Sequence, residues 1–100
     1  MDNNIIEKFS NWIIKEKHNL EKNKISILDI KKTSYDVVKR SVYVDILSGR
    51  YFSRITLWES GEIDLEKLLI DTGETVCYKS LIVDKSNCID VCYNFIKNLG

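Results

Sequence analysis

The spacing of apolar residues changes twice along this chain of 100 residues, and this pattern limits the folds open to it. Near the N-terminus, apolar side chains recur about every three to four positions, which is typical of an amphipathic helix. From Ile25 onward the period is two and β-branched residues become frequent, as in half-buried strands. The helical spacing returns after about Asp84. The order helix, strands, helix predicts an α+β domain.

The N-terminal segment predicts one amphipathic helix, which ends at Asn23-Lys24. Its apolar stripe comprises Ile5, Ile6, Phe9, Trp12, Ile13 and Leu20. Asp2, Asn3 and Asn4 are candidate N-caps, because their side chains can accept hydrogen bonds from free backbone N–H groups. The opposite side of the helix mixes lysines and glutamates, which favours a solvated surface over a membrane-binding one.

Short turns that contain glycine divide the middle of the chain into about five strands. The expected strands cover Ile25 to Ile30, about Val37 to Leu47, Tyr51 to Trp58, the stretch around Ile63 and Leu65, and Thr75 to about Leu81. The turns are expected at Ser48-Gly49-Arg50, Ser60-Gly61 and Asp71-Thr72-Gly73-Glu74. Turns this short make consecutive strands antiparallel neighbours, so we expect a meander sheet. In the third strand the side that carries Ser53, Ile55 and Leu57 should face the core.

A second amphipathic helix is expected to begin near Asp84 or Ser86, either of which can cap it. Its apolar stripe comprises Cys88, Val91, Cys92, Phe95 and Leu99. Two apolar helical stripes and one sheet are most simply satisfied when both helices pack on the same face of the sheet. Residues 1–100 then form a single domain, and the other face of the sheet is open to solvent.

Charge and cysteine content argue against several classes of function. Fifteen Lys and Arg residues balance fifteen Asp and Glu residues, so we expect no binding to nucleic acids or anionic membranes. The first residues form no apolar run of the kind found in signal peptides, and no stretch is apolar and long enough to span a bilayer. Three cysteines without any proline are unlike a secreted disulfide scaffold. We therefore expect a cytoplasmic protein.

No group of residues has the composition of a catalytic or metal site. His18 is the only histidine, and it follows Lys17 on a polar helical stretch, which predicts exposure to solvent. Cys88 and Cys92 lie four positions apart, but a closed zinc site needs about four ligands, and both thiols fit the core as small apolar side chains. The glycine turns lack the strand-to-helix context of a phosphate-binding loop. We predict no enzyme activity, no cofactor and no metal.

The acidic residues are concentrated in one segment. Residues 59–74 contain six Asp and Glu residues and one lysine, so this segment has a net charge of minus five and the rest of the chain plus five. Because Glu62, Asp64 and Glu66 alternate along one strand, they project from one face, beside the preceding strand of the hairpin. The sequence predicts an acidic surface with aromatic anchors, made by Tyr43, Asp45, Arg54, Trp58, Glu59, Glu62, Asp64 and Glu66.

Two interpretations of this surface stay open. An open sheet face has to be polar somewhere, and Trp58 could simply pack against a loop. Alternatively, the face binds a protein: its carboxylates attract a basic partner, and Trp58 and Tyr43 provide the desolvated contacts. A positively charged cleft that holds phosphate-bearing substrates, as in many toxins, would fit such a face.

The segment Arg54 to Thr75, RITLWESGEIDLEKLLIDTGET, resembles the immunity proteins of bacterial polymorphic-toxin systems, in particular the TriTu family. The resemblance rests on the Trp-Glu-Ser-Gly hairpin, the acidic strand after it and the Thr-Gly-Glu turn, and it extends loosely over both helices. The family pattern carries over to Trp58, Glu59, Ser60, Gly61, Asp64, Asp71, Thr72 and Gly73. The Ser-Gly and Thr-Gly pairs shape the hairpins. The closing segment, Leu81 to Gly100, is less acidic than the family pattern.

The resemblance implies an antitoxin that neutralises a cognate effector delivered by type VI secretion or contact-dependent growth inhibition. For TriTu the implied effector is an ADP-ribosyltransferase that acts on elongation factor Tu, and an RNase toxin is the alternative. We expect stoichiometric binding that covers the basic active-site cleft of the toxin, and a monomer or weak oligomer when the protein is free. The rival functions are an adaptor or oligomerising module that adds a strand at a sheet edge, and an enzyme with Cys77, Cys88 or Cys92 as nucleophile.

Overall fold

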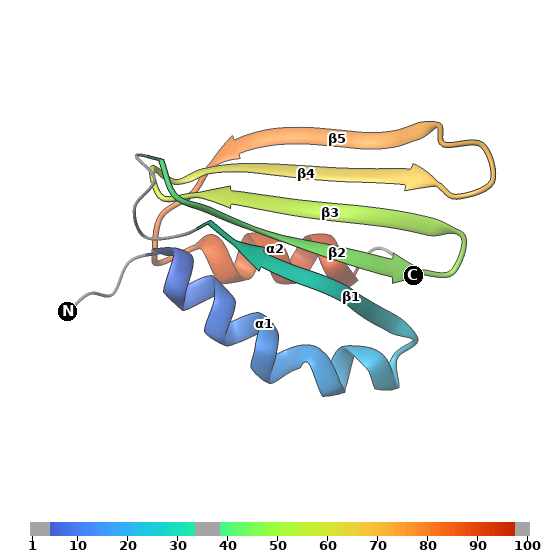
Figure 1. Ribbon diagram of the computed structural model, residues 1–100, viewed down its shortest axis with the longest axis horizontal. Coiled ribbons are helices and arrows are strands. Elements are labelled where there is room, and N and C mark those ends of the chain that lie inside the picture. Colours follow the sequence, from blue (N-terminus) through green and yellow to red (C-terminus); the bar gives the residue numbers. More distant parts are fainter. Residues whose placement is uncertain (1–4, 34–38, 98–100) are drawn as a thin grey trace.

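A computed structural model describes residues 5–33 and 39–97 of the chain (Figure 1). The elements follow in the order α1 (Ile5–Lys22), β1 (Ile25–Lys32), β2 (Ser41–Ser48), β3 (Tyr51–Trp58), β4 (Glu62–Leu69), β5 (Thr75–Ile82) and α2 (Cys88–Lys97). This order confirms the predicted α+β class, with one helix before and one after a five-stranded sheet. Neither described helix has the length and apolar character needed to cross a membrane.

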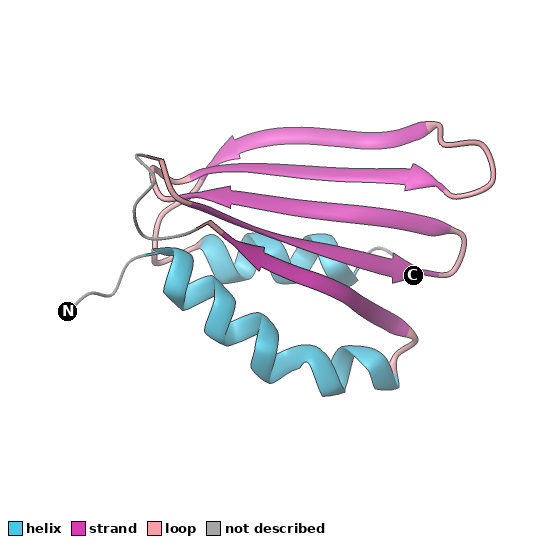
Figure 2. Cartoon of the chain, viewed as in Figure 1, coloured by secondary structure: helices cyan, strands magenta, loops and turns pink. Residues whose placement is uncertain are grey.

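The strands form one antiparallel meander in the order β1-β2-β3-β4-β5, as the short turns predict (Figure 2). At the β2–β3 turn, Ser48 pairs with Tyr51, and Gly49 between them has a φ of 59°. β1 extends two residues beyond the predicted end, to Lys32, and its register shifts between Ile27 and Asp29. The expected beginning of the second strand at Val37 lies outside the described residues.

The core lies between the two helices and one face of the sheet. Alternate residues of β2, β3 and β4 are buried: Val42, Val44 and Ile46, then Ser53, Ile55 and Leu57, then Ile63 and Leu65. All of them except Ser53 join the buried apolar residues of α1 and α2 in a single cluster. The predicted orientation of the third strand, with its aliphatic side inward, is therefore confirmed.

α1 buries the stripe that its spacing predicts, with Ile6, Phe9 and Ile13 almost fully enclosed. Trp12 is only half-buried, because it lies at the margin of the interface between the helices. There its ring meets the ring of Tyr93 in α2 edge-on, with 6.4 Å between the centroids. The candidate N-caps of this helix lie outside the described residues.

Asp84, one of the two predicted caps, caps the turn that leads into α2. The Asp84 carboxylate accepts hydrogen bonds from the hydroxyl of Ser86 and from the backbone N–H groups of Ser86 and Asn87, at 2.6, 2.8 and 3.1 Å. These hydrogen bonds, that from the hydroxyl above all, lower the pKa of Asp84. The cap thus uses an ionised carboxylate at the N-terminus of the helix, where the helix dipole also favours negative charge.

The buried stripe of α2 differs from the predicted one. Cys88, Cys92 and Ile96 are fully buried, whereas Val91 and Phe95 are half-buried. Residues four apart lie on one face of a helix, so the row from Cys88 to Ile96 points into the core and the row of Val91 and Phe95 lies at its margin. Leu99, the last residue of the predicted stripe, lies outside the described residues.

Candidate protein-binding face

The face of the sheet opposite both helices, here called the open face, carries the residues that alternate with the core residues. The strand register aligns them in rows that cross the sheet. One row comprises Lys31, Tyr43, Thr56, Asp64 and Ser80, and the next comprises Asp29, Asp45, Arg54, Glu66 and Tyr78. Strand order and register alone therefore bring together side chains from all five strands.

Most of the predicted contact residues lie on the open face: Tyr43, Asp45, Arg54, Trp58, Glu62, Asp64 and Glu66. Glu59 differs, because it lies in the turn between β3 and β4 rather than on a strand. Whether these residues contact a partner stays a prediction.

Asp45 and Arg54 pair with each other across β2 and β3. Arg54 donates from Nε to Oδ1 of Asp45 at 2.6 Å and from Nη2 to Oδ2 at 3.0 Å, which makes the pair bidentate. The guanidinium also lies over the ring of Tyr43, 4.2 Å from its centroid. The hydrogen bond to Asp45 is the main reason that the pKa of Arg54 is raised. The negative charge of Asp45 is thus matched within the protein, a pairing that the sequence prediction did not include.

The three carboxylates on β4 differ in how far nearby cations compensate them. Glu66 lies opposite Arg54, and the two attract each other electrostatically. Glu62 forms an ion pair with Lys39, with 3.2 Å between Nζ and Oε1. Asp64 lies opposite two uncharged residues, Thr56 and Ser80. The negative charge of the open face is therefore least compensated at Asp64.

Trp58 ends β3 on the open face and is half-buried. The ammonium group of Lys39 lies 5.5 Å from the centroid of the indole ring. The same lysine binds Glu62, so an aromatic ring and a carboxylate share one cation at this end of the face. Part of the indole remains accessible on the face that neither helix covers.

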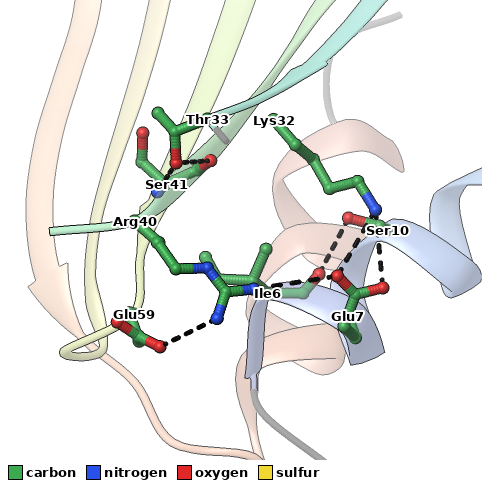
Figure 3. Close-up of polar contacts among 8 residues, drawn as sticks. All are labelled: Ile6, Glu7, Ser10, Lys32, Thr33, Arg40, Ser41 and Glu59. Atoms are coloured by element: carbon green, nitrogen blue, oxygen red, sulfur yellow. Dashed lines mark hydrogen bonds and ion pairs between the residues drawn. The ribbon is translucent and has the colours of Figure 1, made fainter. Parts of the chain in front are cut away.

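Glu59 belongs to an ion-pair network at the rim of the sheet (Figure 3). Arg40 lies between two carboxylates: its Nη1 is 3.4 Å from Glu59 and its Nη2 is 3.9 Å from Glu7 of α1. Lys32 is also 3.4 Å from Glu7. The Arg40 side chain is only 16% exposed, so the network connects α1 to the β3–β4 turn and restrains Glu59 there.

The predicted contact surface did not include an apolar part of the open face. Leu47, Phe52 and Leu68 form a third row across β2, β3 and β4, next to the row of the Asp45–Arg54 pair, and all three side chains are half-buried. Along each strand these residues alternate with core residues, and this spacing places them on the open face. The open face thus combines carboxylates at one end with apolar side chains at the other.

The cysteines offer no activated nucleophile in the core. Burial is the main cause that raises the pKa of both the Cys88 and Cys92 thiols, so both are held protonated. A protonated thiol is a poor nucleophile. Among residues 5–33 and 39–97, no cluster of three or more His, Cys, Asp and Glu side chains is arranged to hold a metal ion.

The match to a protein-family model covers α1 from Glu7 onward, the whole sheet and α2. The family described as "Immunity protein TriTu" matches residues 7–97. The chain belongs to the TriTu family of immunity proteins. No curated protein matches the chain. The TriTu match confirms the resemblance noted in the Arg54–Thr75 segment, assigns the protein to the immunity class, and includes every residue of the open face.

Proposed function

We propose that this TriTu protein neutralises a cognate bacterial toxin by binding it in a stoichiometric complex through the open face. The observation that carries the proposal is the composition of that face. Three carboxylates on β4, Glu62, Asp64 and Glu66, share with Trp58 a surface that neither helix covers. Aromatic anchors surrounded by charge are typical of protein-binding surfaces.

The charge of the face favours a toxin with a basic active-site cleft. Toxins that act on nucleic acids or nicotinamide dinucleotide bind phosphate groups, and such clefts are commonly positive. An ADP-ribosyltransferase or an RNase, delivered by type VI secretion or contact-dependent growth inhibition, fits this description. Carboxylates steer the encounter and raise the association rate, while inhibition itself follows from covering the cleft. The immunity protein then needs no catalytic group, and it acts in the cytoplasm, where such toxins find their substrates.

The Asp45–Arg54–Tyr43 cluster supports a rigid binding surface. The bidentate ion pair and the stacked ring restrain the central side chains of β2 and β3 before any partner arrives. Side chains that are already ordered lose less conformational entropy when a complex forms. The cluster therefore favours a preorganised surface between the acidic and the apolar parts of the face.

Co-expression with the toxin encoded immediately upstream tests the proposal. We expect the wild-type protein to restore growth and to co-purify with the toxin as a one-to-one complex. Trp58→Ala should weaken binding by roughly 2–4 kcal/mol, or about 30-fold to 1,000-fold in Kd, as for a buried aromatic anchor. Asp64→Lys should slow association and reduce its salt dependence.

Asp71→Lys is the matched control, because it makes the same charge reversal in the exposed β4–β5 turn, away from the strands of the open face. It should leave binding nearly unchanged. The proposal is wrong if folded Trp58→Ala and Asp64→Lys proteins bind the toxin as tightly and as fast as the wild type.

A further inference from the structure

β5 forms one edge of the sheet and carries much of the exposed apolar surface of the described residues. It pairs with β4 on one side only. Four large apolar side chains on this strand are exposed: Val76, Tyr78, Leu81 and Ile82. The exposed fraction reaches 58% for Tyr78 and 73% for Ile82. An uncovered apolar edge strand is a ready template for another strand.

A groove runs between this strand and α2, on the face of the sheet where the helices lie. Its volume is about 380 Å³. Leu65, Cys77 and Leu81 line it from the sheet, and Val91 and Phe95 line it from α2. Val91 and Phe95 of α2 therefore do not pack directly against β5. They leave an apolar channel along the side of this edge strand that faces the helices.

The groove is positively charged as well as apolar. Lys67 and Lys79 line it from β4 and β5, and no acidic residue lines it. Lys67 lies over the ring of Tyr51, 4.2 Å from its centroid, and neither lysine forms an ion pair among the described residues. Two cations without carboxylate partners in an apolar groove make the site complementary to an acidic and apolar ligand.

We propose that β5 and this groove bind an extended, acidic and apolar segment of a partner protein, which adds to the sheet as a further strand. The free backbone groups of β5 hydrogen-bond to the added segment, as in other examples of strand addition. On the groove side, a carboxylate of the segment meets Lys79, and flanking aliphatic side chains contact Leu81 and Phe95. On the other side, apolar residues of the segment pack against Tyr78 and Ile82. The groove lies on the opposite side of the sheet from the acidic residues of β4. Tyr78 and Ile82 border the open face, but neither is among the residues proposed to contact the toxin, so the two proposals rest on different residues.

Charge argues against a second copy of the chain as the occupant. Lys79 is the only charged residue of β5. In a symmetric antiparallel pair of two β5 strands centred near this residue, the two lysines lie directly or diagonally opposite each other on the same face. Like charges in these positions destabilise strand pairing. A segment with a carboxylate at that position removes the conflict.

A charge-swap titration with the full chain tests the proposal. The probe is a synthetic peptide of about nine residues, made of Val and Thr around one central Glu. Its binding to the labelled protein is monitored by two-dimensional NMR. Saturable shifts are expected at the backbone amides of residues 75–82 and at residues that line the groove. Lys79→Glu should weaken binding at least about tenfold, and a peptide with central Lys should bind the Lys79→Glu protein better than it binds the wild type.

Lys17→Glu, an exposed charge reversal on α1, is the control and should leave the titration unchanged. Asp64→Lys on the open face should also leave it unchanged, which separates this proposal from toxin binding. The proposal is overturned if the peptide causes no shifts at β5, since Lys79 then only protects the edge from pairing. Equal affinity of the wild type and Lys79→Glu, or a concentration-dependent dimer that pairs through β5, would also overturn it.

Discussion

Replacing Gly61 by alanine should disrupt the junction that holds the Trp58 hairpin in place. The Gly61 N–H donates to the carbonyl of Trp58 at 2.9 Å, and its carbonyl accepts from the N–H of Val83 at 2.8 Å. Its φ is 98°, beyond the range that residues with a Cβ adopt easily. A Cβ at this position would overlap with the carbonyl oxygen of Val83. Gly61 therefore lets the beginning of β4 approach the backbone just after β5.

The cost of Gly61→Ala has two parts. Positive φ costs a residue with a Cβ roughly 1–2 kcal/mol, and forcing an extra methyl group into a packed site costs roughly 1–3 kcal/mol. Because the overlapping atom belongs to the backbone, it cannot move aside as a flexible side chain would. We expect a loss of about 3 kcal/mol in the free energy of unfolding. In a domain of this size, that lowers Tm by roughly 12–24 °C.

Gly49→Ala and Gly73→Ala are matched controls. Both glycines lie in turns with positive φ, 59° and 73°, but no heavy atom beyond their neighbours comes within 4 Å of an added Cβ. Each control should cost only about 1 kcal/mol. Urea and thermal unfolding of the three variants, followed by circular dichroism, measure the difference. Equal losses for all three variants would show that the close approach to Val83 contributes nothing, and would contradict the larger loss expected for Gly61→Ala.

Three further predictions concern the cap, the thiols and the ion pair. Asp84→Asn should lower the unfolding midpoint at neutral pH. The difference in midpoint between the wild type and Asp84→Asn should disappear as the pH falls below the usual pKa of 3.8 and then through the lower pKa of Asp84 in the folded protein, because the carboxylate stabilises α2 only while it is ionised. A difference in midpoint that is unchanged at low pH would contradict this. A thiol reagent should modify Cys77 readily in the native protein and both buried cysteines only after denaturation, whereas fast modification of a buried thiol would favour the enzyme alternative. A double-mutant cycle of Asp45→Ala and Arg54→Ala, measured by unfolding, should give a coupling energy of about 0.5–1 kcal/mol between the two side chains. Because the Arg54 side chain is 42% exposed, this coupling energy should decrease in about 1 M salt. A coupling energy of zero would contradict the bidentate geometry.

Local patterns were sufficient to predict the elements and their order. The change of apolar period at Ile25 marks the boundary between helix and sheet, and the short glycine turns determine that successive strands pair. Alternation within β3 was also enough to predict which side chains enter the core, since burying one face fixes the register. The Asp84 cap follows from chemistry confined to a few consecutive residues.

Features that depend on three-dimensional placement could not be predicted in this way. The ion pair between Asp45 and Arg54 depends on the exact register of β2 and β3. The sequence limits the possible registers but does not determine which one forms. The buried row of α2 depends on how that helix is rotated against the sheet, and both candidate rows have helical spacing. The uncovered edge at β5 depends on where α2 crosses the sheet. For the same reason, the sequence could not show that Lys67 and Lys79 line one groove.

Cross-saturation NMR of the labelled protein bound to its catalytically inactive toxin shows directly whether the toxin binds the open face. In this experiment, saturation of toxin protons attenuates only those signals of the immunity protein that lie at the interface. If the toxin binds the open face, we expect attenuation of the Trp58 indole and of the side chains of β2, β3 and β4 that point away from the core, Arg54 among them. Attenuation confined to α1, α2 or the groove beside β5, with the Trp58 indole unaffected, would contradict it.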